Sequence, residues 1–407
     1  MCQGHPVRFV TLCVVTVLAA CSAADPTPSA TSELSTSSCE RAAVVHTAPA
    51  ALADGTPLNI NDVVAHGGTP LESGDRVVFV AQGPGSWRAS GEFSGWDPSG
   101  GVELRPIAGT DLFIGSAILP RGRSYEYKLV HDGRWVEDPL ARNVRWDGID
   151  RGFGVRGEMN AIVHPADLPR DAGRTVSLGK LEGRSVWVHY PATYDSASCA
   201  KLPSIVIHDG MESLTRGGFA EEADALYAER PDLSAILVFV DVTRPEERMA
   251  EYTVYSAGSR GDRYVSYLAN TLWPAVNARA CAAPAARGIA GASLGGLIST
   301  YAGLEHPDTW GWIGSQSGSF FWADDAMIAR ASALPHEPVR VYLDSGCNAD
   351  PESDNCRPTD QLASVLSSKG YDFVRIREDG GQHDWSYWRG RLRGMLTHFR
   401  ADQRACD

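Results

Sequence analysis

The sequence predicts an α/β fold, a mostly parallel sheet with helices on both faces, preceded by a small β-sandwich. Two observations predict it. From about Val176 onward in the 407-residue chain, apolar strand-like runs alternate with segments that carry apolar residues at helical spacing. From about Leu71 to Val163, short apolar–polar alternations are separated by Gly, Pro or Asp. Strand–helix alternation favours a parallel sheet, whereas closely spaced short strands favour a sandwich.

The N-terminus predicts export. Residues 1–20 contain an apolar run from Phe9 to Ala20, which has the length of a signal peptide and is too short to span a bilayer. The run ends in LAAC, which resembles a bacterial lipobox and predicts cleavage before Cys21 and lipidation of its thiol. Ordinary secretion, with cleavage at a nearby small-residue site, is the alternative. We therefore expect an exported lipoprotein, anchored to a membrane on the periplasmic or cell-surface side.

A tether and a β-sandwich domain follow. Residues 21–50 are rich in Ser, Thr, Pro and Ala, which predicts a flexible tether. Residues 51–165 contain the strand-like runs RVVFVAQG, GEFSGWD, LFIGSAIL and YEYKLVHDGRWVEDP. The second and fourth runs resemble the immunoglobulin-like early-set domains of glycogen-branching enzymes and their carbohydrate-binding relatives. That resemblance makes Trp87, Trp96 and Trp135 candidates for stacking on sugar rings, and packing in the core or between domains is the alternative.

Residues 170–407 form the predicted α/β domain. Its expected strands are SVWVHYP, SIVIHDG, AILVFVDV, ARGIAGAS, WGWIGSQSG, VRVYLDSG and DFVRIRED. Its expected helices are FAEEADALYAE, RYVSYLANTLWPAVNA, GLISTYAGLEHP, DQLASVLSSKG and RGRLRGMLTHFRA. Because the two kinds of segment alternate, the strands are expected to lie parallel, with the helices packed on both faces of the sheet.

Ser293 is the candidate nucleophile. It lies in the G-x-S-x-G pattern of residues 291–295, which by itself is weak in a chain with 41 glycines. Here the pattern stands between a strand-like run, ARGIAG, and a helix-like run, LGGLISTYAGLEHP. That context is typical of the α/β-hydrolase fold, in which a sharp strand-to-helix turn lifts the serine hydroxyl above the sheet.

His383 is the candidate general base. α/β-Hydrolases place their triad in the chain order Ser, then Asp or Glu, then His. His383 fits this order, because it stands on a Gly-rich turn after the strand-like run DFVRIRE. The other histidines beyond the serine lie at a helix end, between prolines or inside the last helix (His306, His336 and His398). The alternative for His383 is a surface loop histidine.

An acid and an oxyanion hole complete the predicted machinery. The acid must come from the loop after VRVYLDSG, where it can orient the imidazole, and we choose Asp350. The alternatives are Asp344, Glu352, Asp354 or a water. An oxyanion hole needs backbone N–H groups. Leu294, directly after the nucleophile, is expected to supply one, and Met211, after SIVIHDG, the other.

Cysteine usage and charge limit the partners. Of the nine cysteines, two leave with the signal and one carries lipid, which leaves an even number in an oxidising compartment. The expected disulfides are Cys347–Cys356, Cys199–Cys281 and Cys39–Cys406. No Cys/His cluster has the spacing of a zinc site, so no metal or other cofactor is expected. A formal charge of −13 and the lack of a basic run argue against nucleic acid.

Four runs, SIVIHDGM, GASLGGL, SQSGSFFW and GGQHDWSYWRGRL, resemble the enterochelin (enterobactin) esterase family. The resemblance spans nearly the whole mature chain, including the β-sandwich. It implies a serine carboxylic-ester hydrolase with Ser293 as nucleophile and His383 as general base, and Asp350 resembles the acid of the related feruloyl-esterase-like group. It also implies a small-molecule substrate, a catecholate siderophore such as enterobactin. The ester (lactone) bonds of that substrate would be cut through an acyl-enzyme, so that iron is released.

The same resemblance gives candidates for substrate binding. RMAEY, residues 248–252, resembles the family's Arg-x-x-Glu segment near the active site, so Arg248 is expected to meet an anionic ferric catecholate. Trp322, Trp385 and Trp388 are candidates for stacking on catechol rings. Inward packing at the start of the last helix is the alternative for the latter two.

Three other functions are open. A feruloyl or acetyl xylan esterase would share the catalytic domain and give the sandwich a sugar-binding role, although SQSGSFFW and WRGRL favour the siderophore branch. A mycolyl-type acyltransferase differs only in the nucleophile that attacks the acyl-enzyme. A catalytically inactive binding lipoprotein is disfavoured, because binding alone does not require the Ser/His order.

Overall fold

The computed structural model describes residues 63, 68–73, 76–119, 124–149, 157–163, 173–194, 201–348 and 354–401. The predicted signal peptide, the predicted lipidation site Cys21 and the predicted tether lie outside the described residues, and so does Asp350. Within the described ranges, no helix is long and apolar enough to cross a membrane.

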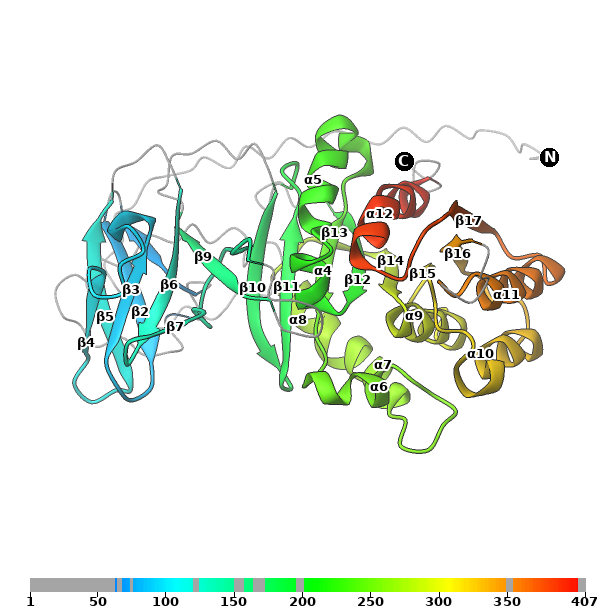
Figure 1. The fold of residues 1–407 in the computed structure, drawn as a ribbon, viewed down its shortest axis with the longest axis horizontal. Coiled ribbons are helices and arrows are strands. Elements are labelled where there is room, and N and C mark those ends of the chain that lie inside the picture. The colour runs from blue at the N-terminus through cyan, green and yellow to red at the C-terminus, as the bar shows by residue number, and fades with distance from the viewer. Residues whose placement is uncertain are drawn as a thin grey trace, which may run out of the picture. The chain divides into compact units, whose positions relative to one another are not determined.

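The N-terminal strands pair antiparallel and form two groups (Figure 1). The first group pairs in the order β1 (Leu71–Ser73), β2 (Arg76–Gln82), β5 (Leu112–Ile118) and β4 (Val102–Pro106). The second group comprises β3 (Trp87–Gly91), β6 (Tyr125–His131), β7 (Arg134–Val136), β8 (Val144–Trp146) and β9 (Met159–Val163). The two groups are joined where β4 also pairs with β3. Phe79 of β2 packs edge-on against Tyr127 of β6, with 5.0 Å between ring centroids. The apolar residues that alternate along these strands therefore meet between the two groups.

One of the expected N-terminal strands is wrong. GEFSGWD forms a 3₁₀ turn, η1 (Glu92–Ser94), followed by Trp96 at a φ of 58°. The hydroxyl of Ser94 accepts from the Gly91 N–H at 3.0 Å and holds the turn. Such local side-chain bonds compete with a strand ladder, which is why the apolar–polar alternation misled here. The other three expected strand runs are confirmed by β2, β5, β6 and β7.

The second part of the chain contains a mostly parallel sheet. Its strands are β10 (Arg174–Leu181), β11 (Arg184–Tyr190), β12 (Leu202–His208), β13 (Ile236–Val240), β14 (Ala282–Ala292), β15 (Trp312–Gln316), β16 (Arg340–Cys347) and β17 (Phe373–Asp379). They pair in the order β10-β11-β13-β12-β14-β15-β16-β17. β11 runs antiparallel to both of its neighbours, β10 and β13, and all pairs from β13 to β17 are parallel. The predicted α/β-hydrolase sheet is confirmed.

Helices cover both faces of this sheet, as predicted (Figure 1). One face packs against α4 (Gly210–Thr215), α5 (Phe219–Glu229) and α12 (Trp385–Arg400). The other packs against α7 (Gly261–Tyr267), η4 (Leu268–Leu272), α8 (Trp273–Asn277), α9 (Leu294–Glu305), α10 (Trp322–Ala333) and α11 (Cys356–Ser368). Along β12, Ile205 and Ile207 face the first set while Val206 faces the second, and all three are fully buried. A strand buried on both faces reads as a continuous apolar run, which is what SIVIHDG shows.

The parallel strands bring distant residues to one edge. Because parallel strands end at the same side of the sheet, the segments that follow β12, β14, β15, β16 and β17 meet there. Short elements, η3 (Pro245–Glu247) and α6 (Arg248–Glu251), follow β13 at the same edge. The candidate residues of the site come from these segments.

Candidate active site

Ser293 stands at a sharp turn between β14 and α9. Its φ of 57° and ψ of −121° are unusual for a residue with a side chain and mark a strained backbone. The glycines make the turn possible. A Cβ on Gly291 would lie 2.8 Å from the carbonyl carbon of Gly295, and one on Gly295 would lie 3.2 Å from the His208 Cβ. The structure thus builds the strand–turn–helix context that the G-x-S-x-G pattern predicted.

The Ser293 hydroxyl is held by a second serine. Its Oγ lies 3.2 Å from Oγ of Ser319, and the Ser319 N–H donates to the Ser293 carbonyl at 3.0 Å. Among the described residues, no hydrogen bond joins Ser293 to His383. In hydrolases without substrate the nucleophile–base contact is often loose and tightens only when the substrate binds.

His383 lies on the turn between β17 and α12. Its Nδ1 is 2.8 Å from Oδ1 of Asp354, and its ring packs edge-on against Trp388 with 4.9 Å between centroids. The next residue, Asp384, caps α12, because its carboxylate accepts from the Ser386 N–H at 2.8 Å. The cap fixes the turn, and the contact with Asp354 leaves Nε2 as the nitrogen that can serve a nucleophile.

Asp354 is the carboxylate that the structure places against the imidazole. It is fully buried, and its Oδ2 accepts from the Gly346 N–H at 2.5 Å. Burial would raise the pKa of Asp354, but the hydrogen bonds from His383 and from the Gly346 N–H outweigh it and hold the pKa below its usual range. Asp354 is therefore ionised and suited to stabilise an imidazolium.

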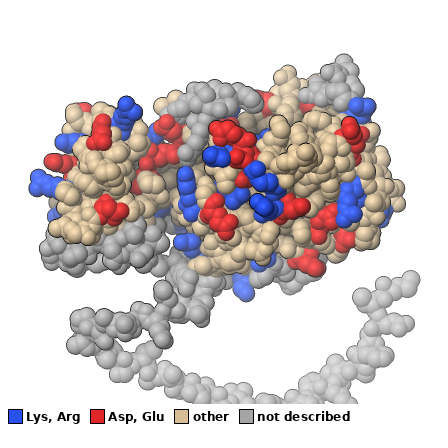
Figure 2. Space-filling view, turned by 90° about the horizontal axis from the view of Figure 1, so that it is seen from below, with Lys and Arg blue, Asp and Glu red and all other residues tan. Residues whose placement is uncertain are grey.

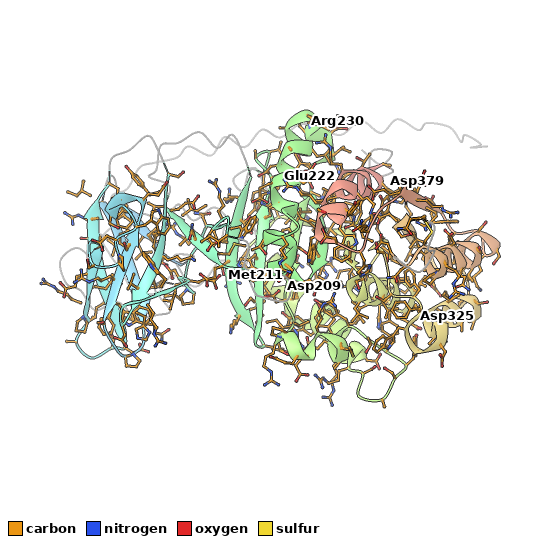
Figure 3. All side chains as sticks on the ribbon, in the orientation of Figure 1. Asp209, Met211, Glu222, Arg230, Asp325 and Asp379 are labelled. Carbon is orange, nitrogen blue, oxygen red and sulfur yellow. A yellow bond between two sulfur atoms is a disulfide. The ribbon has the colours of Figure 1, made fainter. Side chains whose placement is uncertain are left out.

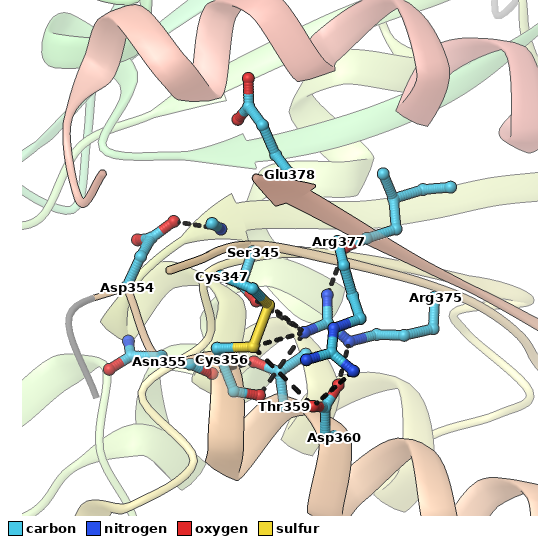
Figure 4. Close-up of a disulfide and its surroundings, with 12 residues drawn as sticks. Ser345, Cys347, Asp354, Asn355, Cys356, Thr359, Asp360, Arg375, Arg377 and Glu378 are labelled. Atoms are coloured by element: carbon cyan, nitrogen blue, oxygen red, sulfur yellow. Dashed lines mark hydrogen bonds and ion pairs between the residues drawn. A yellow bond between two sulfur atoms is a disulfide. The ribbon is translucent and has the colours of Figure 1, made fainter. Parts of the chain in front are cut away.

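The predicted Cys347–Cys356 disulfide is present next to this acid (Figure 4). It joins the end of β16 to the start of α11, and Asp354 lies between the two cysteines. Cys281 is also disulfide-bonded, and its expected partner, Cys199, lies outside the described residues.

Of the other predicted acids, only Asp344 lies among the described residues, and no hydrogen bond joins it to His383. Asp344 is fully buried, and its Oδ2 accepts from Gln316 Nε2 at 3.2 Å. Burial raises the pKa of Asp344 to about 6. Asp350, the acid chosen from the sequence, and Glu352 lie outside the described residues. Asp354, one of the alternatives, is the described carboxylate that bonds the imidazole.

One of the two predicted oxyanion donors is corrected. Leu294 is the first residue of α9, so its N–H has no acceptor within the helix. The N–H of Met211 already donates to Oδ1 of Asp241 at 2.9 Å, so it is not free to meet an oxyanion. Met211 and Asp209 lie together where β12 passes into α4 (Figure 3).

Arg248 does not present a free charge. Its guanidinium forks onto the carboxylate of Asp209, with Nε–Oδ1 at 2.6 Å and Nη2–Oδ2 at 2.7 Å. Glu251, the other charged end of the Arg-x-x-Glu segment, is bonded to Arg184 at 3.0 Å. The expectation that Arg248 meets an anionic ligand stays a prediction, and such a ligand would have to share the guanidinium with the Asp209 carboxylate. Basic and acidic side chains are also interspersed on the face shown in Figure 2.

His208 shapes the loop beside the turn. Its Nδ1 is 2.8 Å from the hydroxyl of Tyr264, and the side chain is buried. Burial, helped by the nearby charge of Arg248, lowers the pKa of His208 to about 3. The imidazole is therefore neutral under ordinary conditions and packs against the first turn of α9 through Gly295.

Of the three tryptophans that were candidates for substrate stacking, two are buried and one is half-buried. Trp385 is 9% exposed and packs edge-on against Phe219 and Trp388, so its predicted contact with substrate is corrected. Trp388 is also buried, and its Nε1 donates to Ser317 Oγ at 3.0 Å. The apolar stripe of α12 that faces α5 requires this inward packing. Trp322 is half-buried, and its Nε1 donates to Ser256 Oγ at 3.3 Å.

Two polar contacts were missed by sequence reasoning. Ser319 bonds the nucleophile, and Arg391 lies behind Asp354, with Nη2 3.3 Å from Oδ2. Both residues fall within runs that carry the family resemblance, but their local spacing holds no signal for either contact. Among the residues that the structure describes, no group of three or more His, Cys, Asp or Glu could hold a metal ion.

The arrangement defines a class of protein. A serine on a strained strand-to-helix turn, and a histidine–carboxylate pair on the same edge of an α/β-hydrolase sheet, are the parts needed for acyl transfer from an ester. Together with membership of the family of putative esterases, they make this protein a carboxylic-ester hydrolase.

Residues 182–399, more than half of the chain, match the family described as putative esterases, and the chain belongs to this family. Uncharacterized protein YbbA of Bacillus subtilis is 30% identical over 235 residues, covering 53% of this chain and 91% of that protein. The iron(III) enterobactin esterase of Dickeya dadantii is 26% identical over 297 residues, covering 65% of this chain and 64% of that protein.

A solved structure shares the fold. The enterobactin esterase FES of Shigella flexneri, crystallised in the presence of enterobactin, is 20% identical, with a TM-score of 0.50. The match covers 85% of this chain and 99% of that chain.

Proposed function

We propose that this protein is a serine esterase that hydrolyses the lactone ester bonds of a catecholate siderophore such as enterobactin. One observation carries the esterase mechanism: Ser293 stands on the strained turn, at the edge of the sheet where His383 is paired with Asp354. The substrate class is supported by the relatives, because several of them are iron(III) enterobactin esterases. The family of putative esterases fits the same reaction.

The proposed reaction proceeds through an acyl-enzyme. Ser293 Oγ attacks the ester carbonyl carbon while its proton passes to Nε2 of His383, and the Leu294 N–H faces the oxyanion that forms. The intermediate collapses, and His383 returns the proton to the leaving alcohol. Water then attacks the acyl carbon, giving its proton to the imidazole, and Ser293 is released as a hydroxyl.

Asp354 has a supporting role in both halves of this reaction. Its Oδ1 accepts the Nδ1 proton of His383, which fixes the tautomer with Nε2 free to act as base. The negative carboxylate then stabilises the imidazolium. For substrate contact we propose Trp322, which is half-buried and follows Phe321, a ring that is 51% exposed. Stacking of a catechol on an accessible aromatic ring is the expected contact.

A product analysis tests the substrate. The purified protein is incubated in parallel with enterobactin, its ferric complex and methyl ferulate, and the products are followed by mass spectrometry. Linear trimer, dimer and monomer from the trilactone, with methyl ferulate intact and no products from Ser293→Ala, are expected. Release of ferulate with the trilactone intact would instead assign the enzyme to plant cell-wall esters.

The N-terminal parts belong to the same proposal. We propose that residues 51–165 form an immunoglobulin-like early-set domain, which the two antiparallel strand groups support. We also propose that Cys21 carries lipid and anchors the exported enzyme, which the LAAC run supports. Incorporation of labelled palmitate that is lost in Cys21→Ser tests the anchor, and unchanged labelling would contradict it.

A further inference from the structure

A buried cation lies behind the proposed acid. Arg391 of α12 is 7% exposed, and its guanidinium reaches carboxylates from three segments. Nη1 is 2.8 Å from Oε2 of Glu378, Nη2 is 3.3 Å from Oδ2 of Asp354, and Nε forms an ion pair with Oδ1 of Asp344 at 3.0 Å. Nη2 also donates to Ser317 Oγ at 2.9 Å. A cation that meets this many acceptors in the interior is held in one orientation.

We propose that Arg391 is a positioning residue of the catalytic centre, which fixes the Asp354 carboxylate so that Oδ1 faces Nδ1 of His383. The inference rests on the proposed function, because it gives Arg391 a part in that mechanism. Arg391 touches neither the substrate nor the reacting atoms. It acts through Asp354: by holding the carboxylate, it sets the orientation of the His383 imidazole.

The geometry of Asp354 supports this role. One of its oxygens is used by His383, and the other is shared by the Gly346 N–H and Arg391. Rotation of the carboxylate would break all of these contacts together. The two contacts of Oδ2 therefore determine the position of Oδ1. A fork of N–H groups suits that task, whereas a single ammonium group does not define a plane.

A second connection runs from Arg391 to the imidazole ring. Arg391 and Trp388 both donate to Ser317 Oγ, at 2.9 Å and 3.0 Å. The ring of Trp388 packs edge-on against His383. The guanidinium therefore contacts the Asp354 carboxylate directly and is linked to Trp388 through Ser317. The imidazole of His383 contacts both of these groups.

The charge of Arg391 also affects the protonation of Asp354. Asp344 and Asp354 are both fully buried, and without a cation these like charges would favour protonation. The titratable and charged groups that face the cluster from neighbouring elements are Tyr342 and Asp344 of β16, Arg375 and Glu378 of β17, and His383. The charge of Arg391 is among the influences that keep the pKa of Asp354 low. Its loss is expected to raise that pKa, so activity should disappear at a higher pH as the solution is acidified.

The test compares Arg391→Lys and Arg391→Met with a matched control, Arg393→Met. Arg393 lies on the same helix but is partly exposed and pairs with Glu229 on the surface. The readouts are kcat, KM and the pH profile with 4-nitrophenyl acetate, and the low-field proton resonance of the His383–Asp354 hydrogen bond. A merely structural residue would change the melting temperature but not these readouts in the folded protein.

We expect Arg391→Met to lower kcat by about 10- to 100-fold with little change in KM, as for a displaced catalytic group. Its acidic limb should move to higher pH, and the low-field proton resonance should weaken. Arg391→Lys should keep the pH profile, because the charge remains, but lose about 10-fold in kcat, because the fork is lost. Arg393→Met should match the wild type.

Two outcomes overturn the inference. One is a folded Arg391→Met variant with the kcat, pH profile and low-field proton of the wild type. If Arg391→Met does not fold, Arg391→Lys decides, and an unchanged kcat in that variant overturns the inference. Ser293→Ala is measured in parallel. An active Ser293→Ala would refute the proposed function and this inference together, whereas an inactive one with normal Arg391 variants would refute the inference alone.

Discussion

Oδ1 of Asp354 lies 2.8 Å from Nδ1 of His383, although the two residues are 29 positions apart. The carboxylate stands on the segment from β16 to α11, and the imidazole stands on the turn from β17 to α12. β16 and β17 are neighbouring parallel strands, so both segments leave the same edge of the sheet. The pairing decides which carboxylate can stabilise an imidazolium, and it leads directly to a test.

Asp354→Asn should lower kcat by about 10⁴-fold, because an amide favours the wrong imidazole tautomer. Asp372→Asn is the matched control, since Asp372 is exposed and pairs with Arg340 on the surface. The pKa of Asp354 is lowered in the folded protein, so its ionised carboxylate stabilises the fold. This contribution to the free energy of unfolding should persist in mild acid and vanish as the pH falls through that pKa. Steady-state rates with an aryl ester check the first point, and urea unfolding of the wild type and Asp354→Asn across pH checks the second. Full activity of Asp354→Asn, with loss in Asp350→Asn, would return the role to Asp350.

Ser293→Ala should reduce kcat by about 10⁶-fold and leave the fold intact. The variant should also resist labelling by a fluorophosphonate, which reacts with activated serines. Ser364→Ala, at an exposed serine of α11, is the control and should behave as the wild type. Turnover of an aryl ester by a folded Ser293→Ala would place the nucleophile elsewhere.

Gly291→Ala should destabilise the protein by about 1–3 kcal/mol, because its Cβ would lie 2.8 Å from the Gly295 backbone. Gly390, in the interior of α12, offers the reverse case, since nothing lies within 4 Å of a Cβ added there. Gly390→Ala should stabilise by about 0.5–1 kcal/mol, the usual gain for a helical glycine. Urea unfolding of the two variants measures both effects. Equal stability of Gly291→Ala and the wild type would show that the turn tolerates a side chain.

Replacing both cysteines of the Cys347–Cys356 disulfide by serine should lower stability by about 2–3 kcal/mol. The kcat should fall as well, because Asp354 stands two residues before Cys356, which the disulfide joins to the end of β16 (Figure 4). Thermal unfolding and kcat of the double variant provide the measurements. A loss of stability with an unchanged kcat would mean that other contacts of Asp354, such as the Gly346 N–H, suffice to hold the acid.

His208 should make the protein less stable in acid. Its folded pKa of about 3 lies well below the usual value of 6.5, so between these limits the unfolded chain binds more protons than the folded one. Stability must therefore rise with pH across this window, and at pH 5 the penalty is about 2 kcal/mol. His208→Gln, which does not titrate, should show a flatter dependence of melting temperature on pH between 6.5 and 4. An unchanged slope in that variant would assign the acid sensitivity to other groups.

Much of the fold could be predicted from the sequence, because local patterns encode it. Continuous apolar runs predicted the buried strands β12, β13 and β14, and helical spacing predicted α5, α9 and α12. The failure at GEFSGWD came from a local competitor, the hydrogen bonds of Ser94, that alternation does not record. For the site, Ser293 was predictable because the turn demands glycines on both sides of it, and His383 because chain order and a Gly-rich turn single it out.

The sequence by itself determined the α/β class, the serine turn and the choice of histidine, since each depends on residues close together in the chain. Only the tertiary structure decided the partners. It placed Asp354 against His383, gave the Met211 N–H to Asp241, paired Arg248 with Asp209 and turned Trp385 inward. The reason is physical: a side chain's partner depends on which strands lie side by side and on which groups burial leaves unsatisfied. Neither is a property of local sequence.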